Sequence, residues 1–135
     1  MKMSPVVHFQ MPAEDRKRVA DFYHAAFGWQ MKQLGPEMGN YILATTTESD
    51  ENGKSKKPGE INGGFFTKDK PDQYPGIVIQ VENIREAMKK VKEAGGTVVG
   101  GRMSPSDPDD MPGIGLFIAI RDTEGNLVTL MQPKR

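Results

Sequence analysis

The stretch VVHFQMPAEDRKRVADFYHAAFGWQ, residues 6–30, joins a short run of β-forming residues to an amphipathic segment. Between residues 14 and 27 the apolar side chains recur at the spacing of one helical face. They are Val19, Phe22, Tyr23, Ala26 and Phe27. Asp15 can cap the start of this helix, and Gly28 can take the left-handed conformation that ends many helices. The pattern predicts a strand at 6–11 and a helix at 14–27.

A second stretch, GIVIQVENIREAMKKVKEAGG at residues 76–96, repeats the same order of strand, cap, helix and glycine. A shift of 68 residues takes Asp15 to Asn83 and Gly28 to Gly96, and it also keeps the apolar helical positions in register. Because caps, core positions and terminators all agree, we infer that the chain contains one unit twice.

Three further candidate strands follow each helix. Their approximate bounds are 29–34, 40–47 and 61–67 in the first half, and 97–103, 114–121 and 126–132 in the second. The expected fold class is therefore α+β. We expect a single domain over residues 1–135, made of two βαβββ halves at about 4–68 and 72–133.

The composition excludes several classes of function. Eighteen basic residues balance eighteen acidic residues, so no net field draws in nucleic acid or an anionic membrane. The absence of cysteine rules out disulfides, thiolate metal sites and cysteine nucleophiles. The sequence also lacks an apolar run of membrane-spanning length, a phosphate-binding loop and a nucleophile elbow. We expect a soluble, cytoplasmic protein whose partner is a small molecule.

Two polar segments raise alternatives. Residues 48–60, ESDENGKSKKPGE, have the composition of a mobile hairpin loop, and their KSKK run reads as a solvated tip rather than a binding patch. Residues 104–113, SPSDPDDMPG, contain three aspartates, which suggests a calcium-type carboxylate cluster. Three prolines in the same segment do not suit the turn of such a site, so a solvated loop is favoured.

Several short segments, in their order and spacing, resemble a known family. FYHAAFGW precedes INGGFF in the first half, and EAGGTVV and DTEGN follow in the second. Together they resemble the glyoxalase, bleomycin resistance and extradiol dioxygenase superfamily, whose members are also called vicinal oxygen chelate proteins. The resemblance covers nearly the whole chain. It implies that the two halves form a curled, cup-shaped mixed sheet with the helices outside, and that the protein is a homodimer.

The resemblance also implies where a metal ion would bind. Metal-dependent members hold one divalent ion with side chains on the first and last strands of both units. The matching positions in this chain are His8, Gly63, Gly76 and Thr129. Glu60 and Asn62 lie close to the second of these if the register differs. Two glycines and one hydroxyl cannot supply the ligands that a retained ion needs, so no metal is favoured and His8 is the one surviving candidate ligand.

The alternation of the first strand indicates which residues face a ligand. Val7, Phe9 and Met11 lie on one face, and His8 and Gln10 lie on the other. If the apolar face packs under the helix, the other face lines the cup. By the repeat, the predicted ligand-binding residues are His8, Gln10, Val78, Gln80, Leu127, Thr129 and Met131. We expect Trp29 to pack under the first helix, and no catalytic residue is identified.

Two functions of different class follow from this lining. The favoured one is a glyoxalase- or bleomycin-resistance-like protein that binds a small, partly apolar molecule without a catalytic metal or other cofactor. The alternative is a lyase, isomerase or dioxygenase of the glyoxalase type that uses a divalent metal ion at His8. A third reading makes His8 a strand histidine that is hydrogen-bonded to protein or water.

Overall fold

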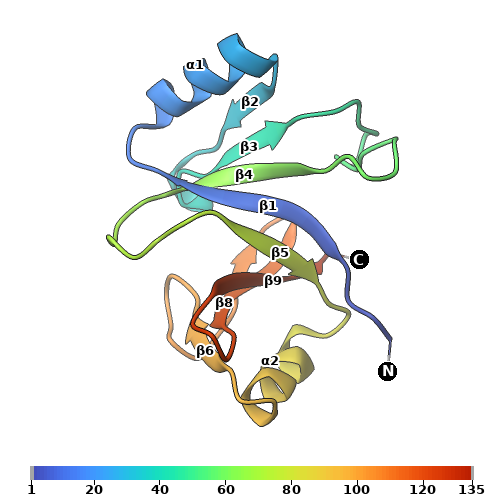
Figure 1. Ribbon diagram of the computed structural model, residues 1–135, viewed down its shortest axis with the longest axis vertical. Helices are drawn as coiled ribbons and strands as arrows, with labels where there is room; N and C mark the ends of the chain where they lie inside the picture. Colours follow the sequence, from blue (N-terminus) through green and yellow to red (C-terminus); the bar gives the residue numbers. More distant parts are fainter. Residues whose placement is uncertain (1, 135) are drawn as a thin grey trace. The chain divides into compact units, whose positions relative to one another are not determined.

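The computed structural model describes residues 2–134, which form two helices and nine strands (Figure 1). The chain divides into two compact units. The N-terminal unit spans His8–Pro75, and the C-terminal unit combines the chain from Gly76 onward with the segment before His8. Each unit repeats the order βαβββ, with one extra short strand in the second. The expected α+β class with tandem βαβββ units is therefore confirmed.

The N-terminal unit places one helix against a four-stranded sheet. Its elements are β1 (Val6–Ala13), α1 (Arg16–Phe27), β2 (Gln30–Gln33), the 3₁₀ turn η1 (Pro36–Met38), β3 (Ile42–Thr45) and β4 (Asn62–Thr67). The strand order is β2-β3-β4-β1. The β1–β4 pair is parallel, while β2–β3 and β3–β4 are antiparallel. Figure 1 shows α1 beside β2, to which the chain returns directly from the helix.

The C-terminal unit has the same plan. Its elements are β5 (Gly76–Gln80), α2 (Ile84–Glu93), β6 (Thr97–Gly100), β7 (Asp109–Met111), β8 (Gly115–Arg121) and β9 (Leu127–Pro133). The strand order is β5-β9-β8-β6, and β7 pairs with β8 outside this path. The β5–β9 pair is parallel, whereas β8–β9, β6–β8 and β7–β8 are antiparallel. In each unit the first strand therefore pairs in parallel with the last.

Both helices begin at the predicted caps. The Asp15 carboxylate accepts a hydrogen bond from Arg18 N at 2.9 Å, and the Asn83 side chain accepts one from Glu86 N at 3.1 Å. These bonds satisfy backbone donors that have no partner within the helix. Gly28 ends α1 with φ of 75°, in the left-handed region that glycine adopts most easily.

Each helix covers a separate apolar core. Under α1 the buried residues are Ala13, Ile42, Ala44 and Phe65. In the second core, Ile84 and Met88 of α2 pack against Val81, Ile118, Ile120 and Leu130. Trp29 packs against the first core, and its ring stacks on Tyr23 of α1 with 4.7 Å between centroids. The expected packing of Trp29 under the first helix is thus confirmed. Neither helix in the described part of the chain is long and apolar enough to cross a membrane.

The segment predicted as a solvated loop at 104–113 contains a strand. Asp109–Met111 form β7, with Asp109 opposite Phe117 of β8. The preceding strand is shorter than predicted and ends at Gly100 rather than near residue 103. Gly100 has φ of 117°, and a side chain there would collide with the backbone of Pro105. The chain therefore leaves the sheet at this glycine, and after residues 101–108 it continues along the edge of β8 as β7, in the same direction as β6.

Asn62, at the start of β4, fixes the loop at 48–60. Its buried amide donates to Ser49 Oγ at 2.8 Å and to the carbonyl oxygen of Gly53 at 3.2 Å, and it accepts from Thr46 N at 2.8 Å. An isolated bridge also pairs Ser49 with Ser55. The loop is therefore attached to the sheet at several points along its length.

We predict that Asn62→Ala loosens this loop, because it removes three hydrogen bonds of a buried amide, each worth about 0.5–1.5 kcal/mol. Trypsin should then cut faster after Lys54 and Lys56 than it does in the wild-type protein. Asn52→Ala is the matched control, because Asn52 is exposed in the same loop. Equal cleavage rates in both variants would contradict the structural role of Asn62.

Candidate functional site

His8 and Gln10 lie on the face of the N-terminal sheet that is turned away from α1, which we call the distal face. Phe9 and Met11, which alternate with them along β1, pack against the core under α1. In the parallel pairing with β4, His8 lies opposite Asn62 and Gln10 lies opposite Gly64. All four of these positions therefore share the distal face.

Tyr41, just before β3, joins this face and was not predicted from the sequence. Its ring lies over Gly64, where any side chain would collide with the ring and its hydroxyl. Gln10 Nε2 donates a hydrogen bond to Tyr41 Oη at 3.2 Å. Burial raises the pKa of Tyr41 to about 12, so its hydroxyl stays protonated at physiological pH. Gly64, next to Phe65 and Phe66 in INGGFF, was a signal that another group packs closely on the strand. It did not indicate that this group is Tyr41.

Gly63 occupies the opposite face from the one that the family resemblance requires. It pairs with Phe9, and a side chain built on Gly63 would collide with the Phe9 ring on the α1 side of the sheet. The implied ligand position at residue 63 is therefore wrong in its orientation as well as lacking a ligating atom. Strand alternation explains this, since one residue of offset changes the face.

The two substitutes for Gly63 are already engaged. Two hydrogen bonds of the buried Asn62 amide hold the loop at 48–60, and the third is accepted from Thr46 N just before it. Glu60 accepts a hydrogen bond from the hydroxyl of Thr47 and is exposed. His8 lies opposite Asn62 in the β1–β4 pair, but the Asn62 amide already bonds to the loop. Neither side chain forms a metal-ligating group with the imidazole in the described part of the chain.

In the C-terminal unit, the predicted residues of β5 and β9 share one face. Val78 lies opposite Thr129, and Gln80 lies opposite Met131. Leu127 precedes Thr129 by two positions and so points the same way. The residues that alternate with these along β5 and β9, such as Ile79, Val128 and Leu130, belong to the core that α2 covers. Val78 and Met131 are buried, with 2% and 8% of their surface exposed, so the half-buried Gln80, Leu127 and Thr129 offer most of the accessible surface.

Gly76 has no side chain to offer, and a Cβ there would lie 3.0 Å from the carbonyl oxygen of Leu127. The four positions that the family implies for a metal thus provide one imidazole, one hydroxyl and two glycines. Residues 2–134 contain no group of three or more histidine, cysteine, aspartate or glutamate side chains arranged to hold a metal ion. These residues do not fit a retained divalent ion, which needs several charged or imidazole ligands.

The imidazole of His8 is half-buried, and burial lowers its pKa below the usual 6.5. The cause is desolvation, which disfavours the charged form. His8 is therefore a neutral group at physiological pH, able to donate from one ring nitrogen and accept at the other.

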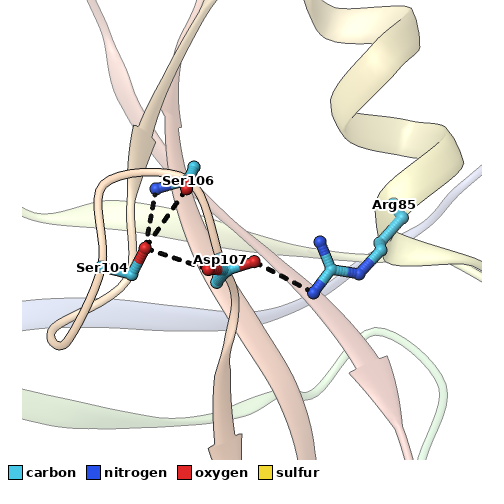
Figure 2. Close-up of polar contacts among 4 residues, drawn as sticks. All are labelled: Arg85, Ser104, Ser106 and Asp107. Carbon is cyan, nitrogen blue, oxygen red and sulfur yellow. Dashed lines mark hydrogen bonds and ion pairs between the residues drawn. The ribbon is translucent and has the colours of Figure 1, made fainter.

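Two of the three aspartates of residues 104–113, Asp107 and Asp109, are engaged by residues of this loop and of α2. Figure 2 shows Asp107 between Ser104 and Arg85 of α2. Arg85 Nη2 donates to Asp107 Oδ1 at 3.2 Å, and Ser104 Oγ donates to Asp107 Oδ2 at 3.1 Å. Both carboxylate oxygens of Asp109 accept from Arg102 N, at 2.8 and 2.9 Å. These contacts favour a loop fixed by its acidic residues over a calcium site.

A groove of about 480 Å³ opens on the N-terminal unit, away from all of the predicted ligand-binding residues. It is lined by Pro12, Ala13, Glu14, Asp15, Arg18, Val19, Phe22 and Lys68. The groove is open to solvent, and the four charged side chains around it are themselves solvated or engaged in capping α1. Water and salt compete strongly with polar ligands at such a place.

Comparisons with known proteins agree with the fold. The family model described as Glyoxalase/Bleomycin resistance protein/Dioxygenase superfamily matches residues 6–130. A search of curated proteins finds no significant match.

Solved structures are similar over their whole length. Methylmalonyl-CoA epimerase from Mycobacterium tuberculosis has a TM-score of 0.67 at 13% identity, covering 100% of this chain and 93% of its own. A variant of Streptomyces coelicolor methylmalonyl-CoA epimerase, in complex with 2-nitronate-propionyl-CoA, has a TM-score of 0.68 at 13% identity, covering 98% and 96%. A hypothetical protein from Bacillus halodurans has a TM-score of 0.64 at 17% identity, covering 99% and 97%. At these identities the structures show a shared fold alone. Because the family model spans most of the sequence, the chain belongs to the Glyoxalase/Bleomycin resistance protein/Dioxygenase superfamily.

Proposed function

We propose that this protein binds a small, partly apolar molecule without a catalytic metal, as bleomycin-resistance-type members do. The observation that carries the proposal is the distal face of the N-terminal unit, where His8 and Gln10 lie half-buried beside Tyr41. A few fixed polar groups on a largely apolar surface are the usual constitution of a small-molecule site.

The neighbours of these side chains favour binding over catalysis. In successive strands across the sheet from Gln10 lie Gly64, Leu43 and Lys32. This row contains one cation and no carboxylate, and the ladder partner of His8 is an amide. Retention of a hard metal ion at this face would require anionic oxygen close to the imidazole. Neither the residues of this row nor the ladder partner of His8 supplies it.

The corresponding face of the C-terminal unit is a second candidate surface. Val78 and Met131 form an apolar floor there, while Gln80 and Thr129 provide amide and hydroxyl groups beside Leu127. We propose that these residues also contact a ligand. Their variants are to be tested separately from those of the N-terminal unit.

A metal-dependent lyase, isomerase or dioxygenase remains the second candidate. The observation in its favour is His8, which stands at the first-strand ligand position of the family and has a lowered pKa, as a neutral metal ligand requires. Methylmalonyl-CoA epimerases are among the solved structures with this fold. Under this alternative a divalent ion would polarise a substrate oxygen.

Other expectations stay predictions. These are the homodimer, the cytoplasmic location, the absence of nucleic-acid and membrane partners, and the organisation of both halves as a single domain. None of them alters the assignment of His8 and Gln10 to the proposed site.

We predict that the purified protein retains far less than one metal ion per chain after incubation with nickel, zinc, manganese or iron and removal of free metal. His8→Ala should leave this content unchanged. The same variant should weaken ligand binding by about 2- to 13-fold, because it removes one neutral hydrogen bond worth about 0.5–1.5 kcal/mol. Elemental analysis is the deciding measurement. One tightly held ion per chain, lost in the variant, would favour the enzyme.

We predict that His8 makes the folded state sensitive to acid. Its pKa is lowered on folding, so the unfolded chain binds the proton more readily. The contribution of neutral His8 to the free energy of unfolding should be complete above pH 6.5. It should be lost as the pH decreases through 6.5 towards the lowered pKa. Urea unfolding between pH 7.5 and 5 should show a smaller loss for His8→Gln than for the wild type. His24→Gln, which retains His8, serves as the control and should keep the acid-sensitive step.

A further inference from the structure

The ring of Tyr41 lies on the distal face, directly over the backbone of Gly64. A side chain at Gly64 would collide with the hydroxyl end of the ring. Gly64 is buried and pairs with Leu43 of β3 on one side and with Gln10 of β1 on the other. The hydroxyl end of the phenol therefore lies against Gly64 of β4 and within hydrogen-bond distance of Gln10 of β1.

In its hydrogen bond with Gln10, the hydroxyl of Tyr41 is the acceptor. Gln10 Nε2 donates to Tyr41 Oη at 3.2 Å. A phenolic hydroxyl can donate one hydrogen bond and accept another. Because the amide NH₂ group is the donor here, the O–H of Tyr41 remains available to a different acceptor.

The surroundings define which acceptor suits this O–H group. Burial raises the pKa of Tyr41 to about 12, so the group is a neutral donor that keeps its proton. The nearest cation in its row is Lys32, two strands from Gly64 and therefore on the order of 10 Å away between backbones. A neutral donor distant from cations matches a neutral oxygen acceptor better than a carboxylate or phosphate, which needs charge compensation when it leaves water.

We propose that Tyr41 is a ligand-positioning residue whose hydroxyl donates a hydrogen bond to the carbonyl oxygen of a neutral, partly apolar ligand on the distal face. This proposal rests on the proposed binding function and adds the class of ligand. The half-buried imidazole of His8 lies on the same face and can contact a second polar group of the ligand.

Tyr41→Phe tests the proposal, because it removes the hydroxyl and keeps the ring on Gly64. The probe is 6-propionyl-2-dimethylaminonaphthalene, a neutral aromatic ketone whose fluorescence shifts to longer wavelength when its carbonyl accepts a hydrogen bond. The matched control variant is Tyr23→Phe, since Tyr23 lies under α1, stacked on Trp29. The control probe is 2-dimethylaminonaphthalene, which lacks the carbonyl group.

We expect Tyr41→Phe to bind the ketone about 2- to 13-fold more weakly than the wild type, the range of one neutral hydrogen bond. The bound ketone should also emit at shorter wavelength in this variant. Affinity for the control probe should not change, and Tyr23→Phe should match the wild type with both probes.

The outcomes separate the two proposals. If the wild type and Tyr41→Phe bind the ketone with equal affinity and equal emission, the role of Tyr41 is overturned and the binding function stands. If the wild type binds neither probe, the proposed function fails and the present proposal fails with it. If Tyr41→Phe does not fold, the proposal is tested by measuring the infrared stretching frequency of the ketone carbonyl bound to the wild-type protein. A frequency typical of a carbonyl without a hydrogen bond would overturn the proposal.

Discussion

Two adjacent glycines in β4 determine how the N-terminal unit is packed. Successive residues of a strand point to opposite faces, so the missing side chain of Gly63 leaves room on the α1 side and that of Gly64 leaves room on the distal side. Phe9 fills the first space and Tyr41 fills the second. The Phe9 ring lies 5.5 Å from that of Trp29, which continues the aromatic contact to α1. The dipeptide Gly63-Gly64 thus makes room both for the aromatic packing under α1 and for Tyr41 in the candidate site.

Much of the fold could be predicted because its signals are local. Asp15 and Asn83 begin helices by bonding a backbone group three residues away, and the apolar spacing that follows each cap spans only a few turns. The duplication then provided an independent check, since each half predicted the other. For the same reason, the alternation along β1 was sufficient to place His8 and Gln10 on one face of their own strand.

What the sequence could not reveal depends on residues that are distant along the chain. The strand β7 exists because Asp109 finds a partner at Phe117, and nothing in a segment rich in proline and aspartate signals that pairing. Tyr41 belongs to the candidate site only through its contact with Gly64. A glycine has no side chain whose hydropathy would show which face of the strand it occupies, so the sequence left the register of the implied ligand position near Gly63 open.

The space that Phe9 occupies limits the routes by which this chain can change. A carboxylate at residue 63 is not accessible through one substitution, because any side chain there meets the Phe9 ring. Phe9 would first have to become small, and losing a packed aromatic ring costs up to about 5 kcal/mol. A domain whose total stability is on the order of 5–15 kcal/mol loses much of its folded population at that step. Any side chain gained at this position would point towards α1 and not towards His8, and it is reached only through less stable intermediates, so stabilising substitutions elsewhere must come first.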